Sequence, residues 1–235
     1  MLALPILLAA TTAACPQNLA SGIDTPASTK QLVTVEAKVA RTTHATLQTW
    51  KRSGGCWVAV AGPYPARVGK NGLSSNRREG DGTTPTGTYR IGRTMYGNEA
   101  NPGVRFRYRR LRCGDWWDED SRSPTYNSFQ HVPCGTKPPF GGGSEGMWQQ
   151  PRPYPFLAVI EFNARPVVPG RGSGMFLHAQ TGGPTIGCIS LRKDQLRAVL
   201  RWLRPDAAPM IAVGTTKQMA PGGNLRKQIP TAQDP

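Results

Sequence analysis

The sequence predicts a mainly β domain of antiparallel sheets, with one helix near its C-terminal end. Short apolar runs separated by Gly and Pro are typical of strands in such sheets. We expect strands near residues 32–39, 47–50, 56–61, 89–91, 156–162, 175–178 and 210–213. A helical period is present at Leu196, Val199, Leu200 and Leu203, which follow the i, i+3, i+4, i+7 spacing. With Pro205 as a stop, this pattern predicts a helix over residues 193–203.

The chain carries a large positive charge. Its 235 residues suit one domain with a full core, and 29 Lys and Arg against 14 Asp and Glu give a net charge of +15. Such a field favours anionic partners such as nucleic acid, anionic lipid and bacterial wall polymer. The basic residues are scattered, however, and the sequence has no zinc finger, basic-region helix or RNA-binding aromatic motif. The charge alone therefore indicates a soluble basic surface, and we expect no nucleic-acid partner.

The first residues resemble an export signal. Residues 1–14 are uncharged and apolar, too short to span a bilayer, and end in small residues as signal peptides do. Thr12-Ala13-Ala14-Cys15 also partly resembles a lipoprotein cleavage site, so lipidation of Cys15 and plain cleavage both stay open. In either case we expect an exported protein in the cell wall, in the periplasm or at the outer face of the membrane. Lipidation would add a membrane tether at Cys15.

Composition divides the rest of the chain into segments. Residues 15–30 are rich in Pro, Ser and Thr and predict a flexible linker. A folded domain is expected over residues 31–214, followed by a polar tail at residues 215–235. Inside the domain, residues 98–154 form a long, poorly periodic insertion. Loops of this length are typically functional lids or are held by a crosslink.

Two cysteines in the insertion supply such a crosslink. Because an exported chain meets an oxidising compartment, we expect a disulfide between Cys113 and Cys134. A metal site made of Cys113, His131 and Cys134 would lack a fourth ligand, so we predict no metal.

Two other features of the sequence have simple structural interpretations. An acidic run without the spacing of a calcium loop indicates a solvated loop; it contains Asp115, Asp118, Glu119 and Asp120. Cys56 lies in an apolar strand before Trp57, and we expect it to be a core thiol.

The stretch at residues 175–191 carries the candidate chemistry. An apolar strand ends at His178, Gly182-Gly183-Pro184 indicates a tight reversal, and a second strand begins at Gly187-Cys188. Antiparallel pairing would set His178 opposite Cys188, with Cα atoms roughly 4.5–5.5 Å apart. A neighbouring imidazole converts a thiol into the nucleophilic thiolate. Gly187 allows the backbone to bend, so we expect the N–H groups of Gly187 and Cys188 to face a developing oxyanion.

Two motifs in this order resemble a known family. His178 followed by Thr185-Ile186-Gly187-Cys188-Ile189 is similar to the active-site motif of the L,D-transpeptidase catalytic domain (YkuD type). The upstream segment Glu79–Tyr89, which contains Thr84-Pro85-Thr86-Gly87, resembles a second signature of that family. The resemblance covers roughly residues 50–214 and identifies the Ser/Thr-Ile-Gly-Cys variant. Ile186 stands where many members have His, and Ser190 stands where many have Arg.

The resemblance implies the YkuD-like fold, with antiparallel sheets and one helix after the strand of the catalytic Cys. It implies that Cys188 attacks peptidoglycan stem peptides, that His178 accepts the thiol proton, and that an amine of a second stem resolves the thioester as a crosslink. Gly187 belongs to the catalytic set. Thr185, Ser190 and Arg192 are the expected substrate-binding residues, with Arg192 taking over from the missing Arg.

The implied enzyme needs no cofactor and is expected to be a monomer. Anionic cell-wall polymer would be a partner that suits the charge of +15. Two alternatives stay open. Water in place of the acceptor amine would make the protein an L,D-carboxypeptidase, and loss of catalysis would leave a silent wall-binding domain.

Overall fold

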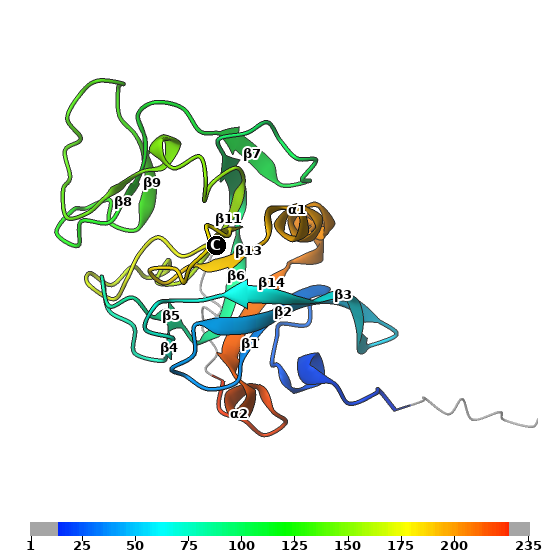
Figure 1. Cartoon of the computed structure of the whole chain (residues 1–235). Helices are drawn as coiled ribbons and strands as arrows, with labels where there is room; N and C mark the ends of the chain where they lie inside the picture. The colour runs from blue at the N-terminus through cyan, green and yellow to red at the C-terminus, as the bar shows by residue number, and fades with distance from the viewer. Residues whose placement is uncertain (1–13, 226–235) are drawn as a thin grey trace, which may run out of the picture.

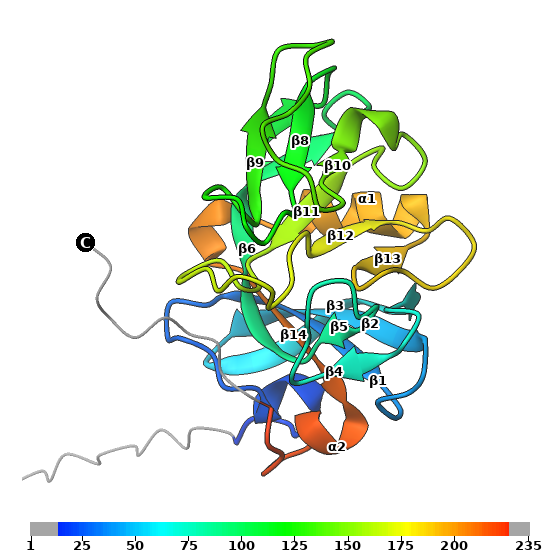
Figure 2. The ribbon, with the colours of Figure 1, turned by 90° about the vertical axis from the view of Figure 1, so that its left-hand side faces the viewer.

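A mixed nine-stranded sheet forms the body of the protein, in the order β11-β12-β13-β3-β2-β1-β14-β6-β7. The structure, a computed structural model, describes residues 14–225. The strands of this sheet are β1 (Gln31–Ala37), β2 (His44–Ser53), β3 (Cys56–Arg67), β6 (Gly87–Gly97), β7 (Arg107–Arg110), β11 (Leu157–Ile160), β12 (Phe176–Ala179), β13 (Ile189–Leu191) and β14 (Met210–Thr215). Because β11 pairs with β6 as well as with β12, the sheet closes on itself. Figures 1 and 2 show two sides of this body.

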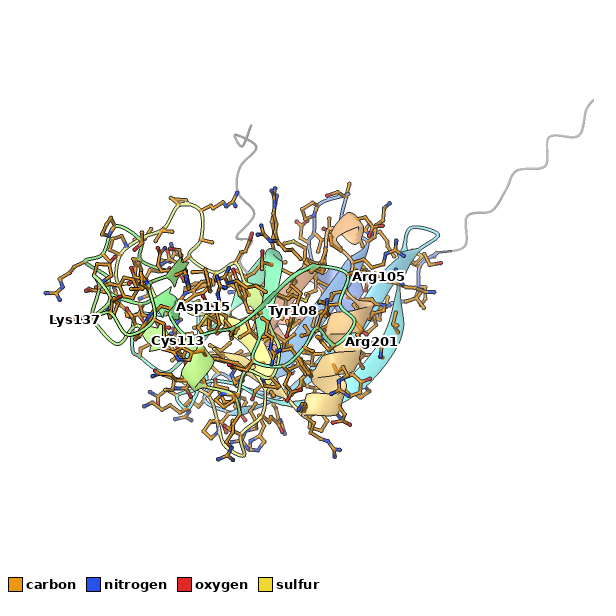
Figure 3. All side chains as sticks on the ribbon, turned by 90° about the horizontal axis from the view of Figure 1, so that it is seen from above. Arg105, Tyr108, Cys113, Asp115, Lys137 and Arg201 are labelled. Atoms are coloured by element: carbon orange, nitrogen blue, oxygen red, sulfur yellow. A yellow bond between two sulfur atoms is a disulfide. The ribbon has the colours of Figure 1, made fainter. Side chains whose placement is uncertain are left out.

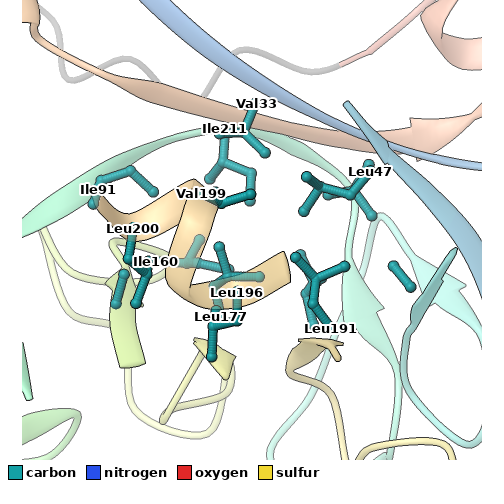
Figure 4. Close-up of a cluster of buried hydrophobic side chains, with 14 of the residues drawn as sticks. Val33, Leu47, Ile91, Ile160, Leu177, Leu191, Leu196, Val199, Leu200 and Ile211 are labelled. Carbon is teal, nitrogen blue, oxygen red and sulfur yellow. The ribbon is translucent and has the colours of Figure 1, made fainter. Parts of the chain in front are cut away.

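Helix α1 (Lys193–Trp202) packs its apolar side against the curved sheet. Leu196, Val199 and Leu200 are buried and point among side chains of several strands (Figure 4). Those partners are Val33 of β1, Leu47 of β2, Ile91 of β6, Ile160 of β11, Leu177 of β12, Leu191 of β13 and Ile211 of β14. The helix therefore ties the strands together around one core. It begins at Lys193, directly after β13, which places it beside the strand that follows Cys188.

The mainly β prediction and the helix after the Cys188 strand are confirmed. The prediction of an antiparallel hairpin that sets His178 opposite Cys188 is wrong. Strands β12 and β13 run parallel, and His178 is paired with Ser190. The segment between them does not reverse tightly. Thr185 instead forms a bridge with Gly69, through hydrogen bonds from Thr185 N to the Val68 carbonyl and from Lys70 N to the Thr185 carbonyl.

The insertion builds a small sheet of its own at one end of the body, uppermost in Figure 2. Its strands are β8 (Asp115–Asp118), β9 (Ser128–His131) and β10 (Glu145–Gly146), followed by the 3₁₀ turn η2 (Met147–Gln149). The structure contains the Cys113–Cys134 disulfide. The first loop of the insertion crosses α1, where Gly103 lies against Arg201 (Figure 3).

The prediction that the acidic run forms a solvated loop is also wrong, because Asp115 and Asp118 are fully buried. Asp115 accepts hydrogen bonds from Arg109 Nη2 and His131 Nδ1, each at 2.7 Å. Trp117 and Met147 belong to a hydrophobic cluster that covers these groups. The carboxylates are therefore part of the packing of the insertion. Figure 3 labels Asp115 and Cys113 in this part of the molecule.

The residues expected to be a flexible linker pack on the body. Cys15 is joined to Cys56 by a disulfide, which overturns the prediction of a core thiol at Cys56. A sulfur in a disulfide cannot also carry a lipid, so the structure does not fit lipidation of Cys15. The 3₁₀ turn η1 (Leu19–Gly22) is capped by Asn18 and buries Ala20 completely. The predicted signal peptide, apart from Ala14, lies outside the described residues.

Part of the expected polar tail is also folded. Helix α2 (Thr216–Met219) follows β14 and is capped by Thr215. Met219 is fully buried in a second hydrophobic cluster with Ala20, Leu32 and Trp50. Leu225 also packs against this cluster, so two apolar side chains anchor the polar stretch. Residues 226–235 lie outside the described part.

The remaining elements are short. They are β4 (Leu73–Ser74), β5 (Thr84–Pro85) and the 3₁₀ turn η3 (Pro205–Ala207). No helix within residues 14–225 has the length and apolar character needed to cross a bilayer.

We predict that the insertion depends on its disulfide. Replacing Cys113 and Cys134 together by Ser should lower the free energy of unfolding by about 3 kcal/mol, since the bond closes a loop with a sequence separation of 21 residues. Urea unfolding measures the change. Peptide mapping without reductant should recover the two disulfide pairs and Cys188 as a free thiol. Recovery of Cys56 as a free thiol would contradict the structure.

Candidate active site

Cys188 and His178 line one cleft of about 810 Å³. Its walls come from three parts of the chain: the loop between β4 and β5, the insertion, and residues 173–188. The charged side chains that line it are Arg77, Glu79, Glu119 and Glu145. Trp116 and Tyr154 add aromatic surface. We call this cavity the Cys188 cleft.

Cys188 is the free cysteine of the described chain and lies directly before β13. Its side chain is half-buried. The thiol donates to the carbonyl oxygen of Gly174 at 3.2 Å and accepts from the N–H of Phe176 at 3.4 Å. Burial raises the pKa of Cys188 to about 12, and the carboxylates Glu145 and Glu119 act in the same direction. The thiol of Cys188 is therefore neutral near pH 7.

His178 is buried in β12 with its ring edge-on to Tyr154. Its Nδ1 lies 2.8 Å from the carbonyl oxygen of Ala179. A carbonyl only accepts, so Nδ1 carries the proton and Nε2 is left as the basic nitrogen. Burial lowers the pKa of His178 to about 4, so the imidazole is neutral near pH 7. The hydrogen bonds among residues 14–225 include none between Cys188 and His178. Proton transfer thus requires the two side chains to approach each other, as is common in unliganded sites.

The turn before Cys188 is held by Thr185. Its hydroxyl donates to the Cys188 carbonyl at 2.6 Å and accepts from the N–H of Gly187 at 3.1 Å. The N–H of Gly187 is therefore already occupied, which corrects its expected part in an oxyanion site. The N–H of Cys188 is the remaining candidate. Thr185 lines the Cys188 cleft, but the positions of its hydrogen bonds make it a support for the turn.

Gly187 is required for a different reason. Its φ is +145°, and a Cβ there would lie 2.5 Å from Nη1 of Arg77 and 2.9 Å from the carbonyl oxygen of Thr83. Arg77 is only 5 % exposed. Its Nη1 donates to the Thr83 carbonyl, to Asp81 Oδ1 at 3.3 Å and to the Ile186 carbonyl at 3.5 Å. The buried guanidinium of Arg77 thus packs against the turn before Cys188 and supports it.

A family model described as the L,D-transpeptidase catalytic domain (YkuD) matches residues 35–217, more than half of the chain. The chain belongs to this family. No curated protein and no solved structure matches it. L,D-transpeptidase domains are cysteine-dependent enzymes, and the family acts on peptidoglycan stem peptides.

The insertion gives this L,D-transpeptidase domain an acidic cleft wall. Burial, together with the nearby charges of Glu145 and Glu79, raises the pKa of Glu119 to about 8. Burial also raises the pKa of Glu145, which accepts from the hydroxyl of Tyr154 at 2.8 Å. Glu119 is therefore protonated at neutral pH, and it lines the same cleft as Cys188. Arg77 is the basic side chain that faces these groups among the described cleft residues.

Sequence reasoning missed Arg77, Glu119 and Glu145. Arg77 stands two residues before Glu79, just outside the quoted Glu79–Tyr89 signature, and its position there was the available signal. Glu119 was assigned to a solvated run because neighbouring charges usually face water. Only the folding of β8 and β10 against the body brings it to the Cys188 cleft.

Two expected substrate-binding residues lie elsewhere. Ser190 is 1 % exposed, and its hydroxyl has no hydrogen-bond partner in the described chain. Arg192 is exposed and pairs with Asp194 at 3.2 Å. Neither lines the Cys188 cleft. Within residues 14–225, no group of three or more metal-binding side chains occurs.

We predict that Arg77 controls the reactivity of Cys188. Arg77→Met removes the positive charge that lowers the thiol pKa and the support of the turn. Alkylation of Cys188 by iodoacetamide at pH 8 should slow by about tenfold, the effect of one pKa unit. The rate is followed by intact mass against pH. Arg78→Met is the matched control, because Arg78 is adjacent, exposed and absent from the cleft lining. Equal slowing in both variants would contradict the assignment.

Glu119 also predicts a pH dependence of stability. Its folded-state pKa of about 8 exceeds the ordinary 4.5, so the folded protein holds the proton more tightly than the unfolded chain. Stability should therefore fall as pH rises from 4.5 towards 8, by at most about 1.4 kcal/mol per pH unit. Glu119→Gln should remove this fall, so the variant gains melting temperature at pH 8 but not at pH 4. Parallel melting curves for both proteins across this range would exclude the effect.

Proposed function

We propose that the protein is a peptidoglycan L,D-transpeptidase that forms cell-wall crosslinks through a thioester on Cys188. The observation that carries the proposal is the Cys188 cleft itself. It combines a free thiol with a neutral imidazole whose tautomer leaves Nε2 basic. The family match supplies the substrate class, peptidoglycan stem peptides.

The geometry supports a two-step acyl transfer. Nε2 of His178 accepts the thiol proton as Sγ attacks the carbonyl of the donor stem, and the N–H of Cys188 stabilises the oxyanion. Collapse breaks the peptide bond, and the imidazolium returns its proton to the departing amine of the D-residue. An acceptor amine then attacks the thioester, gives its proton to His178 and restores the thiol.

The raised pKa of Cys188 fits this sequence of events. A free thiolate would react with any electrophile, whereas a thiol with a pKa of about 12 reacts only when its proton can pass to His178 during the attack. Residues that exclude water from the cleft would then protect the thioester from hydrolysis. The aromatic wall of Trp116 and Tyr154 supports that role.

An exported location is part of the proposal. The two disulfides suit an oxidising compartment outside the cytoplasm. There the net charge of +15 would favour binding to anionic wall polymer.

We predict the products of the reaction. With a disaccharide-tetrapeptide as the substrate, wild-type protein should release the terminal D-residue and form a crosslinked dimer, both measured by mass spectrometry. Cys188→Ala should form neither. His178→Ala should react about 10²–10⁴-fold more slowly, as expected for loss of a general base. His44→Ala is the matched control, since His44 is an exposed histidine outside the cleft.

The same assay separates the alternatives. Tripeptide without dimer would identify an L,D-carboxypeptidase, in which water resolves the thioester. No change in mass, together with retention on isolated cell wall, would identify a silent wall-binding domain. Turnover that survives in Cys188→Ala would reject the site.

A further inference from the structure

A second cavity, of about 470 Å³, shares no lining residue with the Cys188 cleft. It lies where β6, the start of β7 and the turn between η3 and β14 meet the segment before β1. Four arginines line it: Arg90, Arg93, Arg107 and Arg165. We call it the arginine cleft.

The four guanidinium groups are exposed and without partners. No ion pair or side-chain hydrogen bond within the described chain involves them, so their charges are available to a ligand. Glu161 is the acidic residue that lines the arginine cleft in the described chain. Four positive groups against one negative group therefore face a concave site, where low-dielectric walls concentrate the field.

The backbone holds these charges close together. Arg93 precedes Thr94, which is paired with Arg107 across the β6–β7 ladder. Arg90 is paired with Met210 of β14. All four arginines line one cavity, where a bound anion would neutralise their charge.

The floor of the arginine cleft adds a second, independent observation. Thr29 is 1 % exposed and lines the cleft, yet its hydroxyl has no hydrogen-bond partner among the described residues. Buried hydroxyls without partners are uncommon in native structures and call for an explanation. Phe106, Ile91 and Met210 supply apolar surface beside it. The site thus offers a hydroxyl group, an apolar surface and four guanidinium groups to a ligand.

We propose that the arginine cleft binds a multiply charged phosphate group, of the diphosphate or phosphomonoester class. Guanidinium groups pair with phosphate oxygens through two parallel hydrogen bonds. A multiply charged phosphate balances three net positive charges better than a single carboxylate does. The apolar floor accommodates a carbon body attached to the phosphate. The phosphate belongs either to a soluble compound or to a lipid headgroup.

The first test uses inorganic pyrophosphate and titration calorimetry at physiological ionic strength. Wild-type protein should bind it at one saturable site. The double variant Arg90→Gln, Arg107→Gln should bind at least tenfold more weakly. The control double variant Arg122→Gln, Arg201→Gln removes the same charge from exposed sites elsewhere and should change affinity less than twofold. Thr29→Val should weaken binding several-fold, with unchanged melting temperature showing that it folds.

The source of the phosphate is separated by a second arm. Phosphatidylcholine vesicles with and without phosphatidic acid are sedimented with each protein. Retention that needs phosphatidic acid and is lost in the Arg90→Gln, Arg107→Gln variant assigns a lipid headgroup, and pyrophosphate binding without retention assigns a soluble phosphate. The proposal is overturned if pyrophosphate does not saturate, if acetate binds as tightly, or if both double variants lose affinity equally. Cys188→Ala should bind pyrophosphate normally, so this result is independent of catalysis.

Discussion

The contact between Arg77 and the nucleophile turn is the constraint on which the active site depends. A buried charge is tolerated only when hydrogen bonds replace its water, and the carbonyls of Thr83 and Ile186 do this for Nη1. The guanidinium can approach so closely only because residue 187 has no side chain. A side chain at position 187 would collide with Arg77 and with the Thr83 carbonyl, so the position requires glycine. The placement of the Cys188 thiol follows from that packing.

The electrostatics around Cys188 favour a stored, unreactive nucleophile. Arg77 lowers the thiol pKa, but burial and the carboxyls of Glu145 and Glu119 outweigh it. His178 is kept neutral by its own burial, so it can accept a proton but does not hold one at rest. Ionisation of the thiol is thus coupled to the arrival of an electrophile. This coupling suits the proposed acyl transfer, in which one carbonyl must be chosen in a polymer with many peptide bonds.

The sequence was informative where local pattern decides structure. Period and stop signals predicted α1 within a residue at each end, and the Thr185–Ile189 motif singled out Cys188 and His178. Prediction from the sequence failed where contacts between distant segments determine the structure. Gly182-Gly183-Pro184 resembles a hairpin turn, but Thr185 bonds to Val68 and Lys70, which sequence order does not indicate. Glu119 resembled a solvated charge because its burial depends on the pairing of β8 with β10, which begins only at Glu145.

The two halves of the Cys188 cleft have different origins, and this bears on specificity. The closed sheet supplies the two candidate reacting groups: His178 lies on β12, and Cys188 lies just before β13. The insertion supplies Trp116, Glu119 and Glu145, which face them across the cavity. The groups on the sheet can therefore keep the same chemistry while a different insertion changes the charge and shape of the ligand that fits the cleft. A protonated carboxyl in that wall can hydrogen-bond a neutral or anionic group, and once ionised it attracts a cation, so the insertion places the groups that would select a ligand of the Cys188 cleft.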